Sequence, residues 1–369
     1  MTSHLFSPIK LRSVSLMNRI VVPPMAQYMA DEHGNAGDWH VMHLGTMAAS
    51  GAGLLITEAT AIDPIGRNAN HYLGIYSDEN EAALKRVIAF CKSISPIKMG
   101  IQLHHSGRKG SVGKPWEGRG ELKLGEGGWR VVSASDNPFP GHTNPIDVPD
   151  EQGLEHLKSL YVRAAQRAAR AGFDVIEIHF AHGYLLNSFL SPLGNMRKDR
   201  YGGDAEGRMR FPLEVYRAVR AVWPAELPIG VRISAVDWIE GGWTIEDSIA
   251  LARVLKSLDC DYVAASSGGI RPEQKIEIKP GYQVPFAEAI RRETGMTTMA
   301  LGLLHDPQLA ESVLAEGKAD MIGIARGMLA DPRWPWRAAL ALGEPLKLPG
   351  PFLNARKVLP PAREPEKKL

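Results

Sequence analysis

Short runs of apolar and β-branched residues recur along the chain and are typical of buried strands. Eight of them are candidate strands, at residues 20–25, 54–58, 99–103, 175–179, 229–233, 262–265, 297–301 and 321–324. Most of the intervals between the runs carry a helical pattern instead. Leu84, Val87, Ile88 and Cys91 occupy the i, i+3, i+4 and i+7 positions of one helix face. The pattern therefore predicts strands that alternate with helices.

Strands that alternate with helices pair in parallel, and eight such units favour a closed barrel. The same helical spacing returns at residues 251–258, after a capping box formed by Thr244 and Asp247. The alternative is an open doubly wound sheet, which would carry a phosphate loop after its first strand. Neither Gly-x-Gly-x-x-Gly nor a Walker pattern occurs in the chain. We therefore expect an α/β protein with a single (β/α)₈ TIM barrel over residues 1–350.

Two intervals are too long to hold one helix alone. Residues 104–149 follow the third strand and are rich in Gly, Pro and Trp, and residues 183–207 follow the fourth strand. Both long loops lie on the C-terminal face of the predicted barrel, where barrel enzymes place their sites. Loops of this length are more often lids or binding elements than decoration.

Composition and charge exclude several classes of partner. The net charge is +2 and no Lys/Arg-rich run stands out, so nucleic acid and anionic membranes are not expected partners. No apolar stretch of about 18 residues occurs, and the N-terminus lacks the pattern of a signal peptide. Cys91 and Cys260 form no Cys-x-x-Cys pair, which disfavours a zinc or iron–sulfur site, and both lie among apolar residues, so we expect buried structural thiols. These features predict a cytoplasmic protein, with a disordered tail at residues 363–368.

Strand alternation directs four polar side chains into the barrel. In the third, fourth and fifth strands the apolar residues share one face, and Gln102, Glu177, His179 and Arg232 share the other. A barrel interior is normally filled by Val, Ile and Leu, and buried polar groups need partners. The alternative is a buried Glu177–Arg232 pair that satisfies only itself, but it leaves Gln102 and His179 unexplained. The pattern favours a ligand at this end of the barrel.

The fourth strand runs directly into two histidines and a tyrosine. His179, His182 and Tyr184 bring two imidazoles and a phenol to the barrel mouth. Histidine is a common metal ligand, but no carboxylates at other strand ends complete a coordination shell, so no metal site is predicted. Schiff-base chemistry needs a lysine at an inward strand end. Lys109 and Lys114 lie in a loop instead, which weakens that class.

The seventh and eighth strand ends are where barrels commonly bind phosphate. Gly302 follows the seventh strand, and Gly323, Ala325 and Arg326 lie at the end of the eighth. Small residues let backbone N–H groups approach a phosphate, and Arg326 supplies positive charge. Alone, this signal is also compatible with an ordinary glycine loop and a surface arginine.

The motifs at these positions resemble those of the Old Yellow Enzyme family, in particular its bacterial, thermophilic-like branch. The resemblance extends from about Leu5 to about Arg356. The motifs that carry it are Asn18-Arg19-Ile20, Pro23-Pro24-Met25, Gln27-Tyr28, Glu58-Ala59-Thr60, Gly100 to Lys109, Phe173 to Tyr184, Ser191-Pro192-Leu193, Asp199 to Gly203 and Pro280 to Val284.

The resemblance implies a tightly bound, non-covalent FMN across the strand ends, with NADPH or NADH as reductant. Several positions would bind this cofactor. Pro24, Met25 and Ala26 would lie along the flavin, Ala59 and Gln102 would border its pyrimidine part, Arg232 would sit at the N1 and O2 edge, and Gly302, Gly323, Ala325 and Arg326 would hold the phosphate. A fixed guanidinium at the N1 edge stabilises the negative charge of a reduced flavin.

The resemblance further implies an ene-reductase that acts on small enone-type substrates. His179 and His182 would hydrogen-bond the carbonyl oxygen of the α,β-unsaturated substrate, and Tyr28 would close over it. Hydride would pass from flavin N5 to the β-carbon, and Tyr184 would protonate the α-carbon. A homodimer or homotetramer is expected. Residues 351–369 would form a C-terminal extension, from which Arg356 would reach the substrate site of a neighbouring subunit.

Two departures from the branch concern the flavin site. The branch usually has a cysteine after Pro-Pro-Met, where this chain has Ala26, and a glycine where this chain has Ala325. The first departure leaves open a flavin barrel enzyme that oxidises or demethylates its substrate. A flavin redox sensor without turnover is a further alternative, and a flavin-free barrel lyase or metal hydrolase is another. A dienoyl-CoA reductase relative with an iron–sulfur site is disfavoured, because no cysteine follows Arg326.

Overall fold

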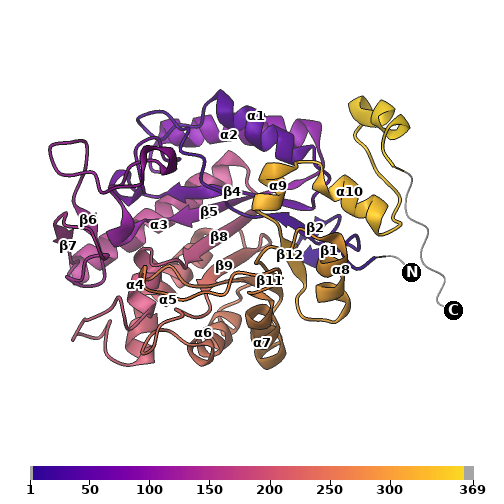
Figure 1. The fold of residues 1–369 in the computed structure, drawn as a ribbon. Coiled ribbons are helices and arrows are strands. Elements are labelled where there is room, and N and C mark those ends of the chain that lie inside the picture. The colour runs from indigo at the N-terminus through magenta and orange to yellow at the C-terminus, as the bar shows by residue number, and fades with distance from the viewer. Residues whose placement is uncertain (1–2, 361–369) are drawn as a thin grey trace.

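A closed barrel of eight parallel strands forms the centre of the computed structural model, which describes residues 3–360 (Figure 1). The barrel strands are β3 (Ile20–Val22), β4 (Leu54–Ala61), β5 (Lys98–His104), β8 (Val175–Phe180), β9 (Ile229–Ser234), β10 (Tyr262–Ser266), β11 (Thr298–Ala300) and β12 (Met321–Gly323). Each corresponds to one of the eight predicted runs, and β12 pairs with β3 to close the ring. The predicted (β/α)₈ barrel is confirmed. The first strand ends earlier than expected, because Pro23 and Pro24 have no N–H for the ladder.

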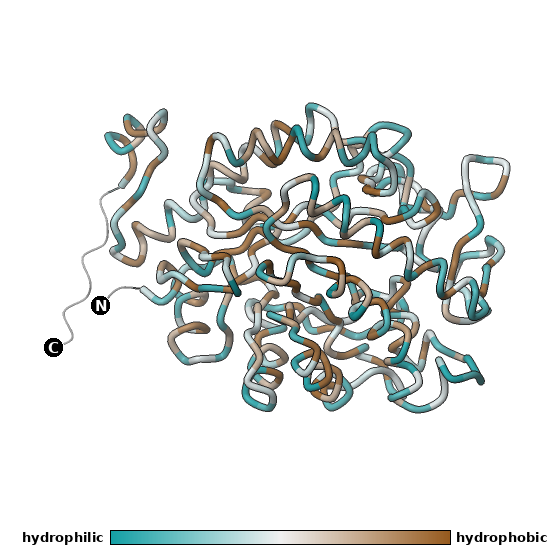
Figure 2. Tube along the Cα trace, turned by 180° about the vertical axis from the view of Figure 1, so that it is seen from behind, coloured by the Kyte–Doolittle hydropathy of each residue, from teal (hydrophilic) through white to brown (hydrophobic). Residues whose placement is uncertain are grey.

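Helices surround the barrel and connect consecutive strands (Figure 1). They are α1 (Asp38–Ala48), α2 (Asp78–Ile94), α3 (Glu151–Ala171), α4 (Leu185–Leu190), α5 (Ala205–Val222), α6 (Ile245–Ser257), α7 (Val284–Thr294), α8 (Pro307–Ala315), α9 (Arg326–Ala330) and α10 (Trp334–Ala341). The stripe of Leu84, Val87, Ile88 and Cys91 on α2 is buried, as predicted. Figure 2 shows hydrophobic residues gathered along the central strands and hydrophilic stretches at the outer loops.

The two faces of the strands bury different sets of side chains. Ile101, Ile178 and Val231 belong to the large hydrophobic cluster between strands and helices. Val175 and Tyr262 belong to a smaller cluster inside the barrel. The expected parity of the strands is therefore confirmed, and it places Gln102 and Glu177 on the inner face.

Two pairs of short strands were not predicted. The hairpin of β1 (Ile9–Leu11) and β2 (Val14–Leu16) packs Leu11, Val14 and Leu16 into the cluster inside the barrel, so it closes the N-terminal end. In the long loop after β5, β6 (Val131–Val132) and β7 (Ile146–Asp147) form a small parallel pair. Strands of two or three residues are too short to show a period of two.

The long loops and the C-terminal segment contain short 3₁₀ helices. These are η1 (Pro64–Gly66), η2 (Gly107–Lys109), η3 (Pro115–Glu117) and η4 (Gly350–Lys357). The predicted disordered tail lies outside the described residues. Within residues 3–360, no helix is both long and apolar enough to cross a membrane.

Candidate active site

The polar side chains of Gln102, Glu177 and Tyr262, on β5, β8 and β10, form a hydrogen-bonded group inside the barrel. Gln102 Nε2 donates to Glu177 Oε1 at 2.7 Å, and the Tyr262 hydroxyl donates to Glu177 Oε2 at 3.2 Å. Burial raises the pKa of Glu177, and nearby Arg232 opposes that shift. Among the described residues, Arg232 Nε has no hydrogen-bond partner. Glu177 is satisfied by Gln102 and Tyr262, so the alternative of a self-satisfied Glu177–Arg232 pair is wrong.

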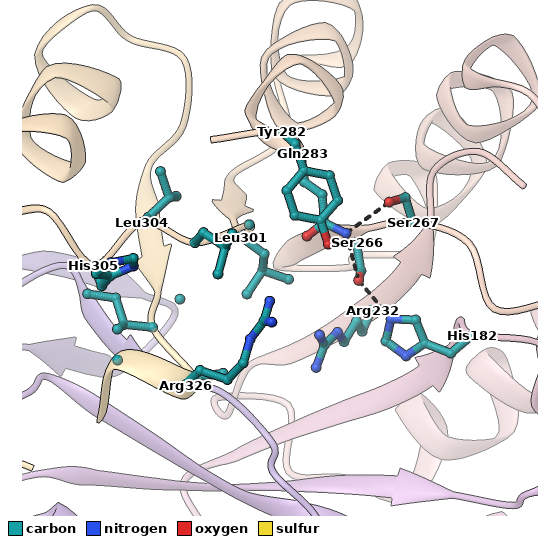
Figure 3. A pocket seen from close by; sticks show the side chains of 16 residues that line it. His182, Arg232, Ser266, Ser267, Tyr282, Gln283, Leu301, Leu304, His305 and Arg326 are labelled. Atoms are coloured by element: carbon teal, nitrogen blue, oxygen red, sulfur yellow. Dashed lines mark hydrogen bonds between the residues drawn. The ribbon is translucent and has the colours of Figure 1, made fainter. Parts of the chain in front are cut away.

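A cavity of about 270 Å³ opens at the ends of the last four barrel strands. Its lining includes Arg232, Gly302, Gly323, Ala325 and Arg326, which the sequence had assigned to one ligand. Figure 3 shows the guanidinium groups of Arg232 and Arg326 turned into this cavity. Gly302 has a φ of +103°, and a Cβ there would lie 3.0 Å from a backbone nitrogen. Glycine is therefore needed at this position for the chain to pass so closely.

His179 and His182 form a directional chain of hydrogen bonds beside the cavity. The backbone N–H of Ala181 donates to His179 Nδ1 at 3.1 Å, which leaves the proton of a neutral His179 on Nε2. His179 Nε2 lies 3.2 Å from His182 Nδ1, and His182 Nε2 lies 2.7 Å from Ser266 Oγ. Burial lowers the pKa of both imidazoles well below the usual 6.5. Both rings are therefore neutral near pH 7, and each offers one N–H.

Tyr184 completes this group at the start of α4. Its ring lies edge-on to His179, with 5.1 Å between the ring centroids, and edge-on to His104 at 4.5 Å. Asn68 Nδ2 donates to the Tyr184 hydroxyl oxygen at 2.9 Å. Burial raises the pKa of Tyr184. The phenol therefore holds its proton at neutral pH and can act as a proton donor.

Lys109 reaches the same place, although no role is predicted for it from the sequence. It ends η2, and its Nζ donates to the backbone carbonyls of His182 and Gly269 at 2.7 and 2.8 Å. The ammonium lies 5.0 Å from the centroid of the Tyr184 ring, and burial lowers the pKa of Lys109 to about 7. Lys109 thereby fixes the turn that carries His182, whose φ is +64°. Lys114 lies in a loop, as predicted, and its Nζ is 3.4 Å from Glu117 Oε1.

Tyr28 lies in the segment that follows β3. Its φ is +55°, and its ring centroid is 5.5 Å from that of Tyr72 and 6.0 Å from that of Trp116. Ala26 packs against the same small cluster, which also contains Ala59. Tyr28 therefore shares a wall of the site with residues from the first two barrel strand ends.

The two cysteines lie elsewhere. Cys91 and Cys260 are buried in the cluster between strands and helices, whereas Ala26 packs in a different cluster. Burial raises the pKa of Cys91 to about 11 and that of Cys260 to about 12. The expectation of buried thiols is confirmed. Neither thiol takes the place of the cysteine that the resemblance leads one to expect at position 26.

Arg356 is not brought to the site within one chain. It lies exposed on η4, where its Nη2 donates to the Leu346 carbonyl at 3.4 Å. Figure 1 shows this segment beside α10, away from β6 and β7. The arginine therefore has no contact with His179, His182 or Tyr184 of its own chain.

Comparison with known proteins identifies relatives over nearly the whole chain. The model of the NADH:flavin oxidoreductase / NADH oxidase family matches residues 4–344. An NADPH dehydrogenase of Geobacillus sp. (strain WCH70) is 42% identical over 344 residues, covering 93% of this chain and 96% of the relative. An NADPH dehydrogenase of Listeria innocua is 40% identical over 357 residues, covering 96% of this chain and 100% of the relative.

Solved structures show the same architecture. Morphinone reductase superposes with a TM-score of 0.78 at 29% identity, over 95% of this chain and 92% of that one. The Old Yellow Enzyme homologue from Zymomonas mobilis gives a TM-score of 0.76 at 26% identity, over 93% of this chain and 94% of that one.

Proposed function

This chain belongs to the NADH:flavin oxidoreductase / NADH oxidase family, and from that membership we propose that it reduces the carbon–carbon double bond of α,β-unsaturated carbonyl compounds. It is an FMN-dependent NADPH dehydrogenase, with NAD(P)H as reductant. The double-bond chemistry, the enone-type substrate and the residue roles below are our proposal.

The residues around the cavity fit FMN. Arg232 is half-buried, its Nε has no hydrogen-bond partner within residues 3–360, and Arg326 adds a second guanidinium. Gly302 and Gly323 line the cavity with backbone alone, and a Cβ at Gly323 would lie only 2.4 Å from the Leu301 side chain, so the packing admits no side chain there. A phosphate and an anionic ring edge are bound by guanidinium groups and by backbone N–H groups that no side chain covers.

The cofactor would be held along the barrel mouth by one set of residues. Arg326, Gly302, Gly323 and Ala325 would hold its phosphate, Arg232, Gln102 and Ala59 its pyrimidine part, and Pro24, Met25 and Ala26 the ring through backbone contacts. When bound and reduced, FMN supplies the hydride for the β-carbon of the substrate.

The protein's own residues would orient and protonate the substrate. The N–H groups of His179 and His182 would bind the carbonyl oxygen, which draws electron density from the double bond. Tyr184 would give its phenolic proton to the α-carbon, and Tyr28 would cover the substrate. The single observation that carries this proposal is the convergence of two neutral imidazoles and one protonated phenol, with 5.1 Å between the His179 and Tyr184 ring centroids.

Anaerobic half-reactions test the proposal. The flavin of the purified holoenzyme is reduced with NADPH and, separately, NADH, and is then mixed with cyclic enones, maleimides or nitroalkenes. Rapid reoxidation together with a saturated product supports the proposal. A flavin that stays reduced with every one of these substrates, and is reoxidised only when oxygen is admitted, contradicts the proposal. That outcome favours the alternatives, a barrel flavoenzyme that oxidises or demethylates its substrate or a redox sensor without turnover.

The assembly and location of the enzyme belong to the same proposal. We propose that residues 1–350 form the FMN-binding barrel of a cytoplasmic homodimer or homotetramer. Residues 351–369 would extend to a neighbouring subunit and place Arg356 at its substrate. The exposure of Arg356 in its own chain supports this role.

A further inference from the structure

Asn68 makes a hydrogen bond to the phenol that the proposed function uses as proton donor. Its Nδ2 lies 2.9 Å from the Tyr184 hydroxyl oxygen, and the Asn68 side chain also interacts with the phenol of Tyr28. No motif of the sequence pointed to Asn68, which lies in the loop after β4. The contact joins residues that are 116 positions apart.

The fold holds Asn68 firmly in this position. The backbone N–H of Val112 donates to the Asn68 carbonyl at 3.0 Å, and an isolated bridge pairs the next residue, Ala69, with Val112. Asn68 is only 6% exposed, and within residues 3–360 its Oδ1 has no hydrogen-bond partner. The buried amide is therefore directed at Tyr184 by its surroundings.

We propose that Asn68 is a positioning residue that makes Tyr184 a stronger and correctly oriented acid. This inference rests on the proposed function. An amide N–H that donates to the phenol oxygen occupies one of its lone pairs, so the O–H of Tyr184 points elsewhere and is free for the substrate. The same N–H bond becomes stronger when the oxygen carries negative charge. Asn68 therefore stabilises the phenolate more than the phenol.

The proton transfer balances with these groups alone. The O–H bond of Tyr184 breaks, and a C–H bond forms at the α-carbon, using the electron pair released when hydride adds to the β-carbon. The electron pair of the broken bond stays on the phenolate oxygen, where Asn68 donates to it. Lys109, whose Nζ is 5.0 Å from the ring centroid, favours the same charge in its protonated form, below its pKa of about 7. A proton taken up from the solvent then restores the phenol, so each turnover consumes one proton.

The opposite orientation of the amide has the opposite consequence. If Asn68 Oδ1 faced Tyr184, it would accept the phenolic O–H and hold the proton away from the substrate. Removal of Asn68 would then lower the pKa of Tyr184 and speed proton transfer. The sign of both effects therefore decides between the two arrangements.

Two variants of the FMN-loaded enzyme provide the test. Asn68→Leu removes the donor at similar volume, and Asn68→Asp replaces the donor by an acceptor of the same shape. The pKa of Tyr184 is measured by NMR with ¹³Cζ-tyrosine, and its signal is assigned as the one lost in Tyr184→Phe. We expect that pKa to rise in both variants and to rise further in Asn68→Asp. Enone-driven reoxidation should slow about five- to tenfold in Asn68→Leu. The decline of this rate that accompanies deprotonation of Tyr184 should shift to higher pH.

The outcomes separate this inference from the proposed function. In a Tyr184→Phe background, Asn68→Asp should slow the enone reaction no further, because the group on which it acts is gone. An unchanged or lowered pKa of Tyr184 in Asn68→Leu overturns the inference, even where Tyr184→Phe is slow. If Tyr184→Phe itself reduces enones at the full rate, the proposed proton donor and this inference fail together.

Discussion

His179 Nε2 and His182 Nδ1 lie 3.2 Å apart and share one hydrogen bond. Because the backbone N–H of Ala181 fixes the proton of His179 on Nε2, His182 accepts at Nδ1 in this arrangement. A substrate oxygen that binds both imidazoles needs the proton of His182 on Nδ1 as well. His182 Nε2 must then accept a hydrogen bond, and Ser266 Oγ at 2.7 Å is the group that can donate it.

The first prediction concerns this serine. Ser266→Ala removes the hydroxyl that would hold His182 in the substrate-binding tautomer, so we expect enone affinity to fall by about tenfold. The measurement is the dependence of the reoxidation rate of the reduced enzyme on enone concentration. Ser257→Ala on α6 serves as the control, since its exposed hydroxyl donates to the Val254 carbonyl of its own helix. Equal enone affinity in both variants would refute the role of Ser266.

The second prediction concerns pH. Burial is the main cause that holds the pKa of His179 and His182 well below 6.5, and neighbouring positive groups add to it. Both imidazoles stay neutral as the pH falls through 6.5, so neither ring should titrate there. The measurement is an NMR titration of the two imidazoles from about pH 5.5 to pH 8, which separates them from Lys109, whose pKa of about 7 lies in the same range. An inflection of either ring at the ordinary histidine pKa contradicts the prediction.

The same shifts determine how stability depends on pH. In the folded protein the two histidines resist protonation, whereas in the unfolded chain they take up protons below about pH 6.5. The unfolded state then binds more protons below pH 6.5. The free energy of unfolding should therefore have its full value above pH 6.5 and decrease as the pH falls below it. Thermal unfolding of the His179→Gln and His182→Gln variants should show a weaker dependence in this window.

Much of the site could be predicted because it lies on regular strands. Gln102, Glu177 and Arg232 follow from the two-residue period of β5, β8 and β9, which fixes the face that each side chain takes. Asn68 and Lys109 lie in loops, and their positions depend on contacts made after the barrel has closed, with the Val112 backbone and the His182 carbonyl. Contacts of this kind leave no periodic pattern of apolar and polar residues in the sequence.

The third prediction concerns Arg232. Arg232→Met removes the guanidinium that would face the N1 edge of the flavin, so the reduced cofactor loses electrostatic stabilisation. We expect weaker FMN binding and a reduction potential lower by on the order of tens of millivolts. The potential is measured by equilibration with a reference dye. Arg253→Met, which changes an exposed arginine on α6, should leave it unaltered. A higher potential in Arg232→Met would be incompatible with the assigned role.

The fourth prediction concerns Tyr184. Tyr184→Phe keeps the ring and its edge-on packing against His104 but removes the proton, so enone-driven reoxidation should slow by about 10²-fold or more. Flavin reduction by NADPH needs no proton from this residue and should remain largely intact. Stopped-flow absorbance separates the two half-reactions. If neither half-reaction changes, Tyr184 is not the proton donor.

The fifth prediction concerns the C-terminal segment. Arg356 is exposed on η4 and donates to the Leu346 carbonyl, far from the site of its own chain, so a role at a substrate requires a second subunit. We expect Arg356→Ala, and likewise truncation after Gly350, to raise the KM for enones several-fold, as the loss of about one charged hydrogen bond would. Lys357→Ala, at the neighbouring exposed position, should leave the KM unchanged.

Mixed assemblies decide whether Arg356 acts in its own chain or in a neighbour. A Tyr184→Phe chain carries an intact Arg356, and an Arg356→Ala chain carries an intact Tyr184. When the two are unfolded and refolded together, a mixed assembly can hold one site with Tyr184 from one chain and Arg356 from the other. We expect a fraction of the enone activity to return with the low KM of the unaltered enzyme. If the mixture shows only the raised KM of Arg356→Ala, the arginine does not complete a neighbouring site, because no combination of the two chains restores it.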